Sequence, residues 1–311
     1  MKLFYYQRED KQPNFGDELN QWLWPKLCPG LFDQDSSTLF VGTGTLLNSK
    51  LAERLKSAEK VVIFSTGAGY EQPVEQIPNN WKICCVRGPL SARQLGLPPK
   101  MAIADGGILI AKLFTSPIAP VVVQSDRTSC SFMPHIHSAT AAAETWQRIC
   151  EQANIRYIDP RWPIEDVLKA IGASELVLAE AMHGAIAADA PCMAWIPVVT
   201  SPRIYAFKWQ DWCASMQLPY RPCRLPPLIN YPRWGRGLRS GAIAARHYLG
   251  AMNNTDSLQY AIAADEGAIV RRLTRLAKCK PFLSHDQVFE QRLAALTDTL
   301  KNCTLKNCVD G

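Results

Sequence analysis

The 311-residue sequence predicts an α/β protein with two successive β/α arrays and a tail of C-terminal helices. Two observations support this fold class. Short apolar runs of strand length alternate with segments of helical periodicity, which is typical of parallel sheets covered by helices. The glycines and reactive polar residues come directly after the apolar runs, and ligands of open parallel sheets bind just beyond the carboxyl ends of the strands.

The first array is expected to cover residues 1–118. Proline is favoured in the first turn of a helix, so Pro89 indicates that a helix starts there. The expected strands are Lys2–Tyr6, Thr38–Val41, Val61–Phe64, Lys82–Val86 and a short Met101–Ala104, and the expected helices are Glu18–Leu27, Leu46–Leu55 and Pro89–Leu95.

The second array is expected to cover residues 119–240, and the helical tail residues 241–311. Arg203–Arg239 is rich in proline, arginine and tryptophan and should be largely loop. Two helices are expected between Asp256 and Leu300, the second opened by a capping box of Ser284 and Gln287. The expected strands are Val121–Gln124 or Ser131–Pro134, Arg156–Ile158, Leu176–Ala179 and Cys192–Pro197, and the expected helices are Thr140–Gln152, Pro163–Ile171 stopped by Gly172, and His183–Ala190.

Composition narrows the class of protein. Hydrophobic residues make up 47% and charged residues 20%, so the chain forms a core and is not disordered. The net charge of +6 suits an anionic ligand or an acidic membrane surface and does not call for nucleic acid. No run of about eighteen apolar residues predicts a membrane span, and the first residues are interpreted as a strand, not as a signal peptide.

The eleven cysteines are scattered without paired spacing. In a chain of this length, this pattern predicts reduced thiols and a cytoplasmic protein. Cys84 and Cys85 are expected to pack in a strand, and Cys303 and Cys308 lack the partners that a zinc site needs. No metal site is therefore predicted.

His183 and Gly184 stand between a predicted strand and a predicted helix. Free amides at a helix start favour an anion, the missing side chain of Gly184 permits close approach, and histidine transfers protons near neutral pH. The pair therefore predicts an anion site with an acid–base group. A packed histidine that caps its own helix explains the position equally well.

Three other strand exits carry candidate residues. Asn14, Gly16 and Asp17 form a turn that opens a helix, where Asn14 and Asp17 either cap the helix, or Asp17 serves as a base or binds an acceptor hydroxyl. The glycine turns at 42–44 and 67–69, which include Thr43 and Gly44, match no phosphate-binding fingerprint. Arg87 could clamp a carboxylate or phosphate, or form a structural ion pair.

Two basic segments complete the candidates. KWQDWC and YPRWGRGLR place aromatic rings beside Lys208, Arg233, Arg236 and Arg239, a mixture that suits sugar rings with a diphosphate or a membrane, but equally a solvated loop packed by its tryptophans. The run VRRLTRLAKCK ends a helix in basic residues, which the helix dipole favours on any surface.

Four segments in order, NFGDELNQWLWP, GTGTLL, VRGPLSARQLG and AEAMHGAIAADA, resemble the polysaccharide pyruvyl transferases. They are most similar to the branch that modifies bacterial exopolysaccharides such as succinoglycan, over about residues 1–212. The resemblance implies a glycosyltransferase-B-like fold of two Rossmann-like domains facing across a cleft. It also implies phosphoenolpyruvate as donor, no cofactor, and a product with pyruvate bridging two sugar hydroxyls as a ketal.

Site residues follow from the resemblance motif by motif. His183 would be the catalytic histidine and Asp17 the carboxylate of the cleft. The donor would be bound by Arg87, Glu180, Gly184 and Arg203, and the acceptor side of the cleft would hold Asn14, Gly16, Thr43 and Gly44. Many family members carry a donor-binding arginine two residues before the histidine, where this chain has Ala181, so either another arginine such as Arg203 supplies that charge or the donor is bound differently.

Two other functions remain open at this point. A nucleotide-sugar glycosyltransferase would share the fold and bind a nucleotide diphosphate sugar. A glycan- or anion-binding protein of a polysaccharide assembly complex would bind sugar and release no phosphate. A lipid-linked acceptor would place the protein at the inner face of the cytoplasmic membrane.

Overall fold

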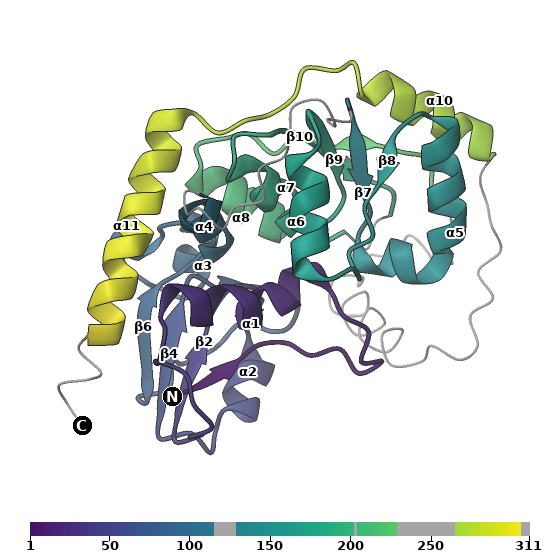
Figure 1. The fold of residues 1–311 in the computed structure, drawn as a ribbon. Coiled ribbons are helices and arrows are strands. Elements are labelled where there is room, and N and C mark those ends of the chain that lie inside the picture. The colour runs from purple at the N-terminus through teal and green to yellow at the C-terminus, as the bar shows by residue number, and fades with distance from the viewer. Residues whose placement is uncertain (115–128, 202–203, 229–264, 306–311) are drawn as a thin grey trace, which may run out of the picture.

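The computed structural model describes residues 1–114, 129–201, 204–228 and 265–305. Over these ranges the chain forms two parallel sheets with helices packed against their faces (Figure 1), which confirms the predicted α/β class. The glycosyltransferase-B-like arrangement and the domain limits stay predictions. No helix of the described ranges has the length and apolar character to cross a membrane.

The first sheet has the strand order β1-β2-β4-β6, and all its pairs are parallel. Alternate residues of its central strands face opposite sides. Phe40 and Val62 pack with α1 in one apolar cluster, and Val41 and Ile63 pack with α2 and α3 in another. The elements are β1 (Lys2–Phe4), α1 (Phe15–Leu27), β2 (Thr38–Val41), α2 (Ser49–Arg54), β4 (Lys60–Phe64), β6 (Trp81–Cys85) and α3 (Pro89–Gln94).

Several short elements extend the first half of the molecule, residues 1–114; residues 129–228, as far as they are described, form the second half. β3 (Thr45–Leu47) and β5 (Gly67–Ala68) pair as a separate two-stranded sheet, so part of the helix predicted for Leu46–Leu55 is a strand. Instead of the predicted strand Met101–Ala104, only Ala102 bridges to Val86. The remaining elements are the 3₁₀ helices η1 (Pro99–Met101) and η2 (Gly106–Ile110), and the helix α4 (Ala111–Phe114).

The second sheet has the order β11-β10-β9-β7-β8, again with parallel pairs. Its first strand along the chain starts at Ser131, as one of the two predicted alternatives has it. The other alternative, at 121–124, lies outside the described residues. The elements are β7 (Ser131–Met133), α5 (Ile136–Gln152), β8 (Arg156–Tyr157), α6 (Ile164–Gly172), β9 (Leu176–Ala179), α7 (Met182–Asp189), β10 (Ala194–Val199), α8 (Ala206–Ser215) and β11 (Cys223–Arg224).

The segment expected to be loop contains a helix, α8, and the strand β11. Trp209 and Trp212 of α8 are fully buried. Their packing stabilises the helix, and the composition of the segment gives no sign of it. Their buried rings cannot stack on a sugar. The basic residues at 233–239 lie outside the described residues.

The two C-terminal helices pack on different halves of the molecule (Figure 1). α10 (Glu266–Leu276) packs against α5, and α11 (Asp286–Leu305) runs back to β6 and η2. Ser284 does not form the predicted capping box, because its backbone amide and its hydroxyl both donate to the buried carboxylate of Asp189.

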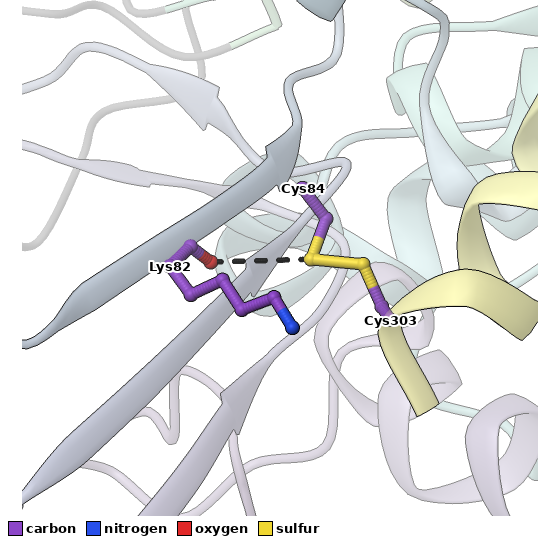
Figure 2. The surroundings of a disulfide bond; sticks show 3 residues. All are labelled: Lys82, Cys84 and Cys303. Atoms are coloured by element: carbon purple, nitrogen blue, oxygen red, sulfur yellow. Dashed lines mark hydrogen bonds between the residues drawn. A yellow bond between two sulfur atoms is a disulfide. The ribbon is translucent and has the colours of Figure 1, made fainter. Parts of the chain in front are cut away.

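A disulfide joins Cys84 of β6 to Cys303 of α11 (Figure 2). The expectation that the cysteines are all reduced is therefore wrong. The two residues are 219 positions apart, and scattered spacing gives no sign of a pair that only the returning α11 brings together. The bond fastens the end of the chain to the first sheet.

Removal of this disulfide should lower stability. A cross-link across so long a loop removes much entropy from the unfolded chain, so Cys84→Ser should reduce the free energy of unfolding by about 2–5 kcal/mol. Guanidinium unfolding of the variant, and of the wild type with and without reductant, measures this. Cys279→Ser, at an exposed free thiol, is the control. Equal midpoints for Cys84→Ser and the oxidised wild type would contradict the expectation.

Candidate functional site

A cavity of about 190 Å³ lies between the two halves of the molecule. Its wall is built by the segments that follow β1, β2, β5, β7 and β9, together with side chains from α2 and one from α8. The strand exits of both sheets thus contribute, as expected for parallel sheets. The lining residues with polar or charged side chains are Tyr6, Arg8, Glu9, Asn14, Asp17, Thr45, Asn48, Lys50, Arg54, Tyr70, Glu71, His135, His137, His183 and Lys208.

His183 reaches the cavity from the first turn of α7. Its side chain is 15% exposed, and its Nε2 atom lies 3.6 Å from Oδ1 of the buried Asp105. Asp105 is fixed in turn by the amide of Gly107, which donates to Oδ1 at 2.9 Å. The imidazole is therefore held beside a carboxylate and opens on the cavity, which is the arrangement of an acid–base group.

Gly16 of α1 leaves room for that imidazole. A Cβ atom at position 16 would lie 2.3 Å from Nδ1 of His183. The glycine predicted for the cleft thus acts by contact with the histidine, and that contact joins the first half of the molecule to the second.

Gly16→Ala should therefore displace His183 from Asp105. Because the added methyl group meets a ring that carries the proposed chemistry, kcat should fall about 100-fold, while the helix itself tolerates alanine. Steady-state kinetics measure the loss, and a thermal unfolding curve checks the fold. Gln21→Ala, at an exposed position of the same helix, is the control. Unchanged kcat would show that the ring position is not critical.

Asp17 lies in the first turn of α1 and lines the same cavity. The Asn14 amide donates to its carboxylate at 2.7 Å, and no side chain caps the helix. The capping explanation for Asn14 is therefore wrong. Burial raises the pKa of Asp17, against the opposing effects of the Asn14 hydrogen bond and the nearby His183 and Lys208 charges. A carboxylate with a raised pKa is a better proton acceptor.

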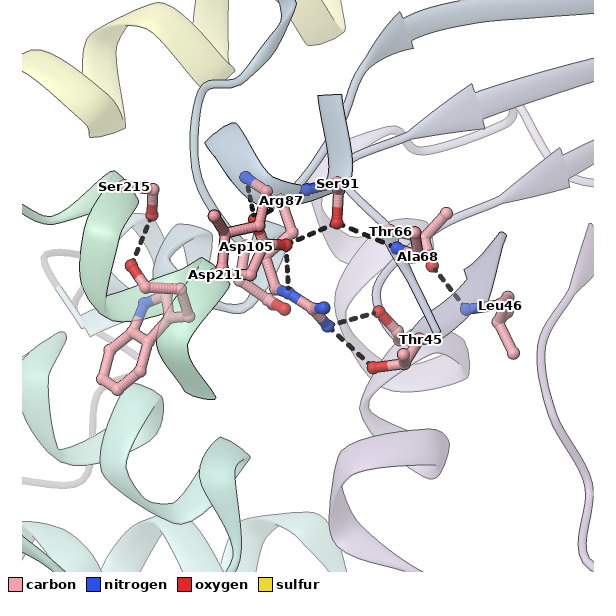
Figure 3. Close-up of polar contacts among 12 residues, drawn as sticks. Thr45, Leu46, Thr66, Ala68, Arg87, Ser91, Asp105, Asp211 and Ser215 are labelled. Carbon is pink, nitrogen blue, oxygen red and sulfur yellow. Dashed lines mark hydrogen bonds and ion pairs between the residues drawn. The ribbon is translucent and has the colours of Figure 1, made fainter. Parts of the chain in front are cut away.

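Arg87 occupies a different place (Figure 3). It is fully buried, and its Nε atom donates to Asp211 at 3.0 Å. Its Nη1 atom donates to the carbonyl of Gly44 and the hydroxyl of Thr45. Arg87 is not part of the cavity wall as the described residues define it. This is the arrangement of a structural ion pair, and a donor-binding role for Arg87 stays a prediction.

Glu180 and Gly184 also serve internal contacts. The buried carboxylate of Glu180 accepts from the amides of His135 and Thr200 and from the Thr200 hydroxyl, which ties together the exits of β7 and β10. A Cβ atom at Gly184 would lie 2.6 Å from Sδ of Met133. The glycine therefore allows α7 to pack on β7, where ligand approach had been expected.

Of the remaining candidate site residues, only Gly44 is seen to line the cavity in the described part of the chain. Gly44, with a φ of +139° that favours glycine, lines the cavity. Thr43 is buried, and its carbonyl accepts from Asn20. Arg203 lies outside the described residues. Ala181 stands just before α7 and supplies no charge.

Two histidines of the cavity, His135 and His137, were not predicted from the sequence. His135 and His137 follow β7, so the same rule of strand exits could have found them. Burial, with the nearby Lys208 charge next in weight, holds the pKa of His135 well below its usual value. His135 is therefore neutral at physiological pH, and its Nδ1 atom accepts from the His137 amide at 3.4 Å.

The fold and the cavity define an α/β protein whose candidate site pairs a histidine with a carboxylate between two parallel sheets. The chain is 42% identical over 227 residues to the succinoglycan biosynthesis protein ExoV of Rhizobium meliloti, which covers 73% of this chain and 68% of that protein. The chain belongs to the family of this exopolysaccharide biosynthesis protein. No family model and no solved structure matches.

Proposed function

We propose that the protein transfers pyruvate from phosphoenolpyruvate to a sugar of a bacterial exopolysaccharide, or of its lipid-linked precursor, at the inner face of the cytoplasmic membrane. The observation that supports this best is the cavity, where His183 and Asp17 lie together with a buried cation, Lys208. Membership in a family of succinoglycan biosynthesis agrees with it.

The residues suit the two proton transfers that ketal formation requires. A sugar hydroxyl gives its proton to Asp17 as its oxygen attacks the central carbon of the donor. His183 delivers a proton to the methylene carbon, which becomes a methyl group. The second hydroxyl then attacks the same carbon, phosphate departs and takes up the proton of this hydroxyl, and the ketal closes. The proton on Asp17 returns to His183 before the next turnover. Atoms and charges balance without a cofactor.

The arrangement of the cavity wall suits a sugar acceptor. Tyr6 and Tyr70 line the side of the cavity formed by the first sheet, and aromatic side chains contact the apolar faces of sugars. Lys50 and Arg54 line the same side, and Lys50 pairs with Glu71 at 2.7 Å. Donor and acceptor would thus enter from different halves of the molecule.

The test is a transfer assay with phosphoenolpyruvate and succinoglycan-type oligosaccharides, free and lipid-linked. Release of phosphate together with a pyruvate ketal on the sugar, seen by mass spectrometry, is the expected result. Sugar binding without phosphate release would instead indicate a glycan-binding protein. Transfer of a sugar from a nucleotide diphosphate donor would indicate a glycosyltransferase.

A further inference from the structure

Lys208 is an unusual residue of the cavity wall. It comes from α8, is 9% exposed, and its ammonium group lies 5.7 Å from the centre of the Tyr70 ring. Among the described residues, no hydrogen bond or ion pair holds this ammonium group. Since burial of an uncompensated charge is costly, proteins keep such a group where it meets a ligand of opposite charge.

The other charged groups nearby already have partners. Arg87 pairs with Asp211, and Arg8 pairs with Asp10 at 2.6 Å. The Glu180 carboxylate accepts from two amides and a hydroxyl, and Lys208 forms no ion pair with it, although the charges of Asp17, Asp105 and Glu180 all favour the protonated amine. His135 adds no positive charge, because its pKa is depressed. Within the described cavity wall, Lys208 is thus a buried cation without an ion-pair partner that can pair with an incoming anion.

We propose that Lys208 is the oxyanion-binding residue of this cavity, and that its ammonium group pairs with the phosphate or the carboxylate of the donor next to His183. Ala181 contributes no charge at the start of α7, and Lys208 supplies it from a different element. The identity of the donor rests on the proposed function, whereas the affinity for an oxyanion does not. Lysine binds such groups as a compact point charge.

This placement has a consequence for pH. Burial, and after it the Arg87 charge, lowers the pKa of Lys208 to about 8. Oxyanion binding should therefore weaken as the pH rises above that value, because the neutral amine offers no charge. The groups that face Lys208 and set this value are Arg87, Asp17, Asp105 and Glu180, together with neutral His135.

The experiment is calorimetric titration of wild type, Lys208→Met and the control Lys169→Met, an exposed lysine of α6. The probes are phosphoenolpyruvate, inorganic phosphate and pyruvate, and the last two show which end of the donor Lys208 holds. Loss of one charge-assisted contact should weaken binding in Lys208→Met roughly ten- to hundredfold, with no change in the control.

A second measurement stands even if that variant does not fold. Sulfate, which keeps its charge between about pH 7 and 9.5, should bind wild type progressively more weakly above about pH 8. A flat profile for wild type would overturn the inference, as would equal affinities of wild type and Lys208→Met, or no oxyanion binding at all.

The inference and the proposed function can fail separately. Oxyanion binding that depends on Lys208, with no transfer to any acceptor, would remove the proposed function and leave the inference. Transfer by wild type, with an unchanged KM for phosphoenolpyruvate in Lys208→Met, would remove the inference and leave the proposed function.

Discussion

His183→Ala should abolish phosphate release and ketal formation, with kcat reduced about 1,000-fold or more, because the variant lacks the imidazole that is proposed to protonate the methylene carbon. The loss should appear in kcat, while the KM for the donor should change little. The fold should survive, since the imidazole lies at the cavity wall and is not part of the apolar core.

Steady-state phosphate release, together with a thermal unfolding curve, measures both expectations. The control is His285→Ala, an exposed histidine before α11, which should behave as wild type. Undiminished turnover by His183→Ala would exclude His183 as the acid–base residue and would leave the histidines after β7 to be tested in its place.

Arg87→Ala should destabilise the protein by about 3–5 kcal/mol, because it leaves the carboxylate of Asp211 buried without its countercharge. Asp211 also accepts from the amides of Leu90 and Ser91, so its charge links α8 to the start of α3 (Figure 3). Urea unfolding measures the loss, and Arg93→Ala, an exposed arginine of α3, is the matched control.

This experiment also decides between the two explanations of Arg87. A destabilised variant that still binds phosphoenolpyruvate below its unfolding transition supports the structural ion pair. A variant as stable as wild type that fails to bind would support the donor-binding role that the family resemblance implies.

Local pattern was sufficient for much of the fold. The strands at Thr38–Val41 and Leu176–Ala179 lie where the sequence predicts them, because continuous apolar runs of that length suit strands buried on both faces. Asn14, Asp17 and His183 were predicted as site residues because each follows a strand, and they do line one cavity. The carboxyl ends of parallel strands lie at the same edge of a sheet.

Long-range partners could not be predicted in this way. Asp211 meets Arg87 from 124 positions away, and Cys303 meets Cys84 from 219. Nothing in the local sequence marks these pairs, since only the packing of α8 and α11 creates them. Asp105 was not predicted as a site residue for the same reason, because only the fold brings it next to His183.

The contact between Gly16 and His183 has a consequence for how the molecule works. The histidine belongs to the second half, yet the atoms that fix its ring, at Gly16 and Asp105, belong to the first. Neither half by itself surrounds the ring, so the position of this histidine depends on the two halves staying together. A substitution that loosens the packing between the halves would therefore disturb His183 without touching it.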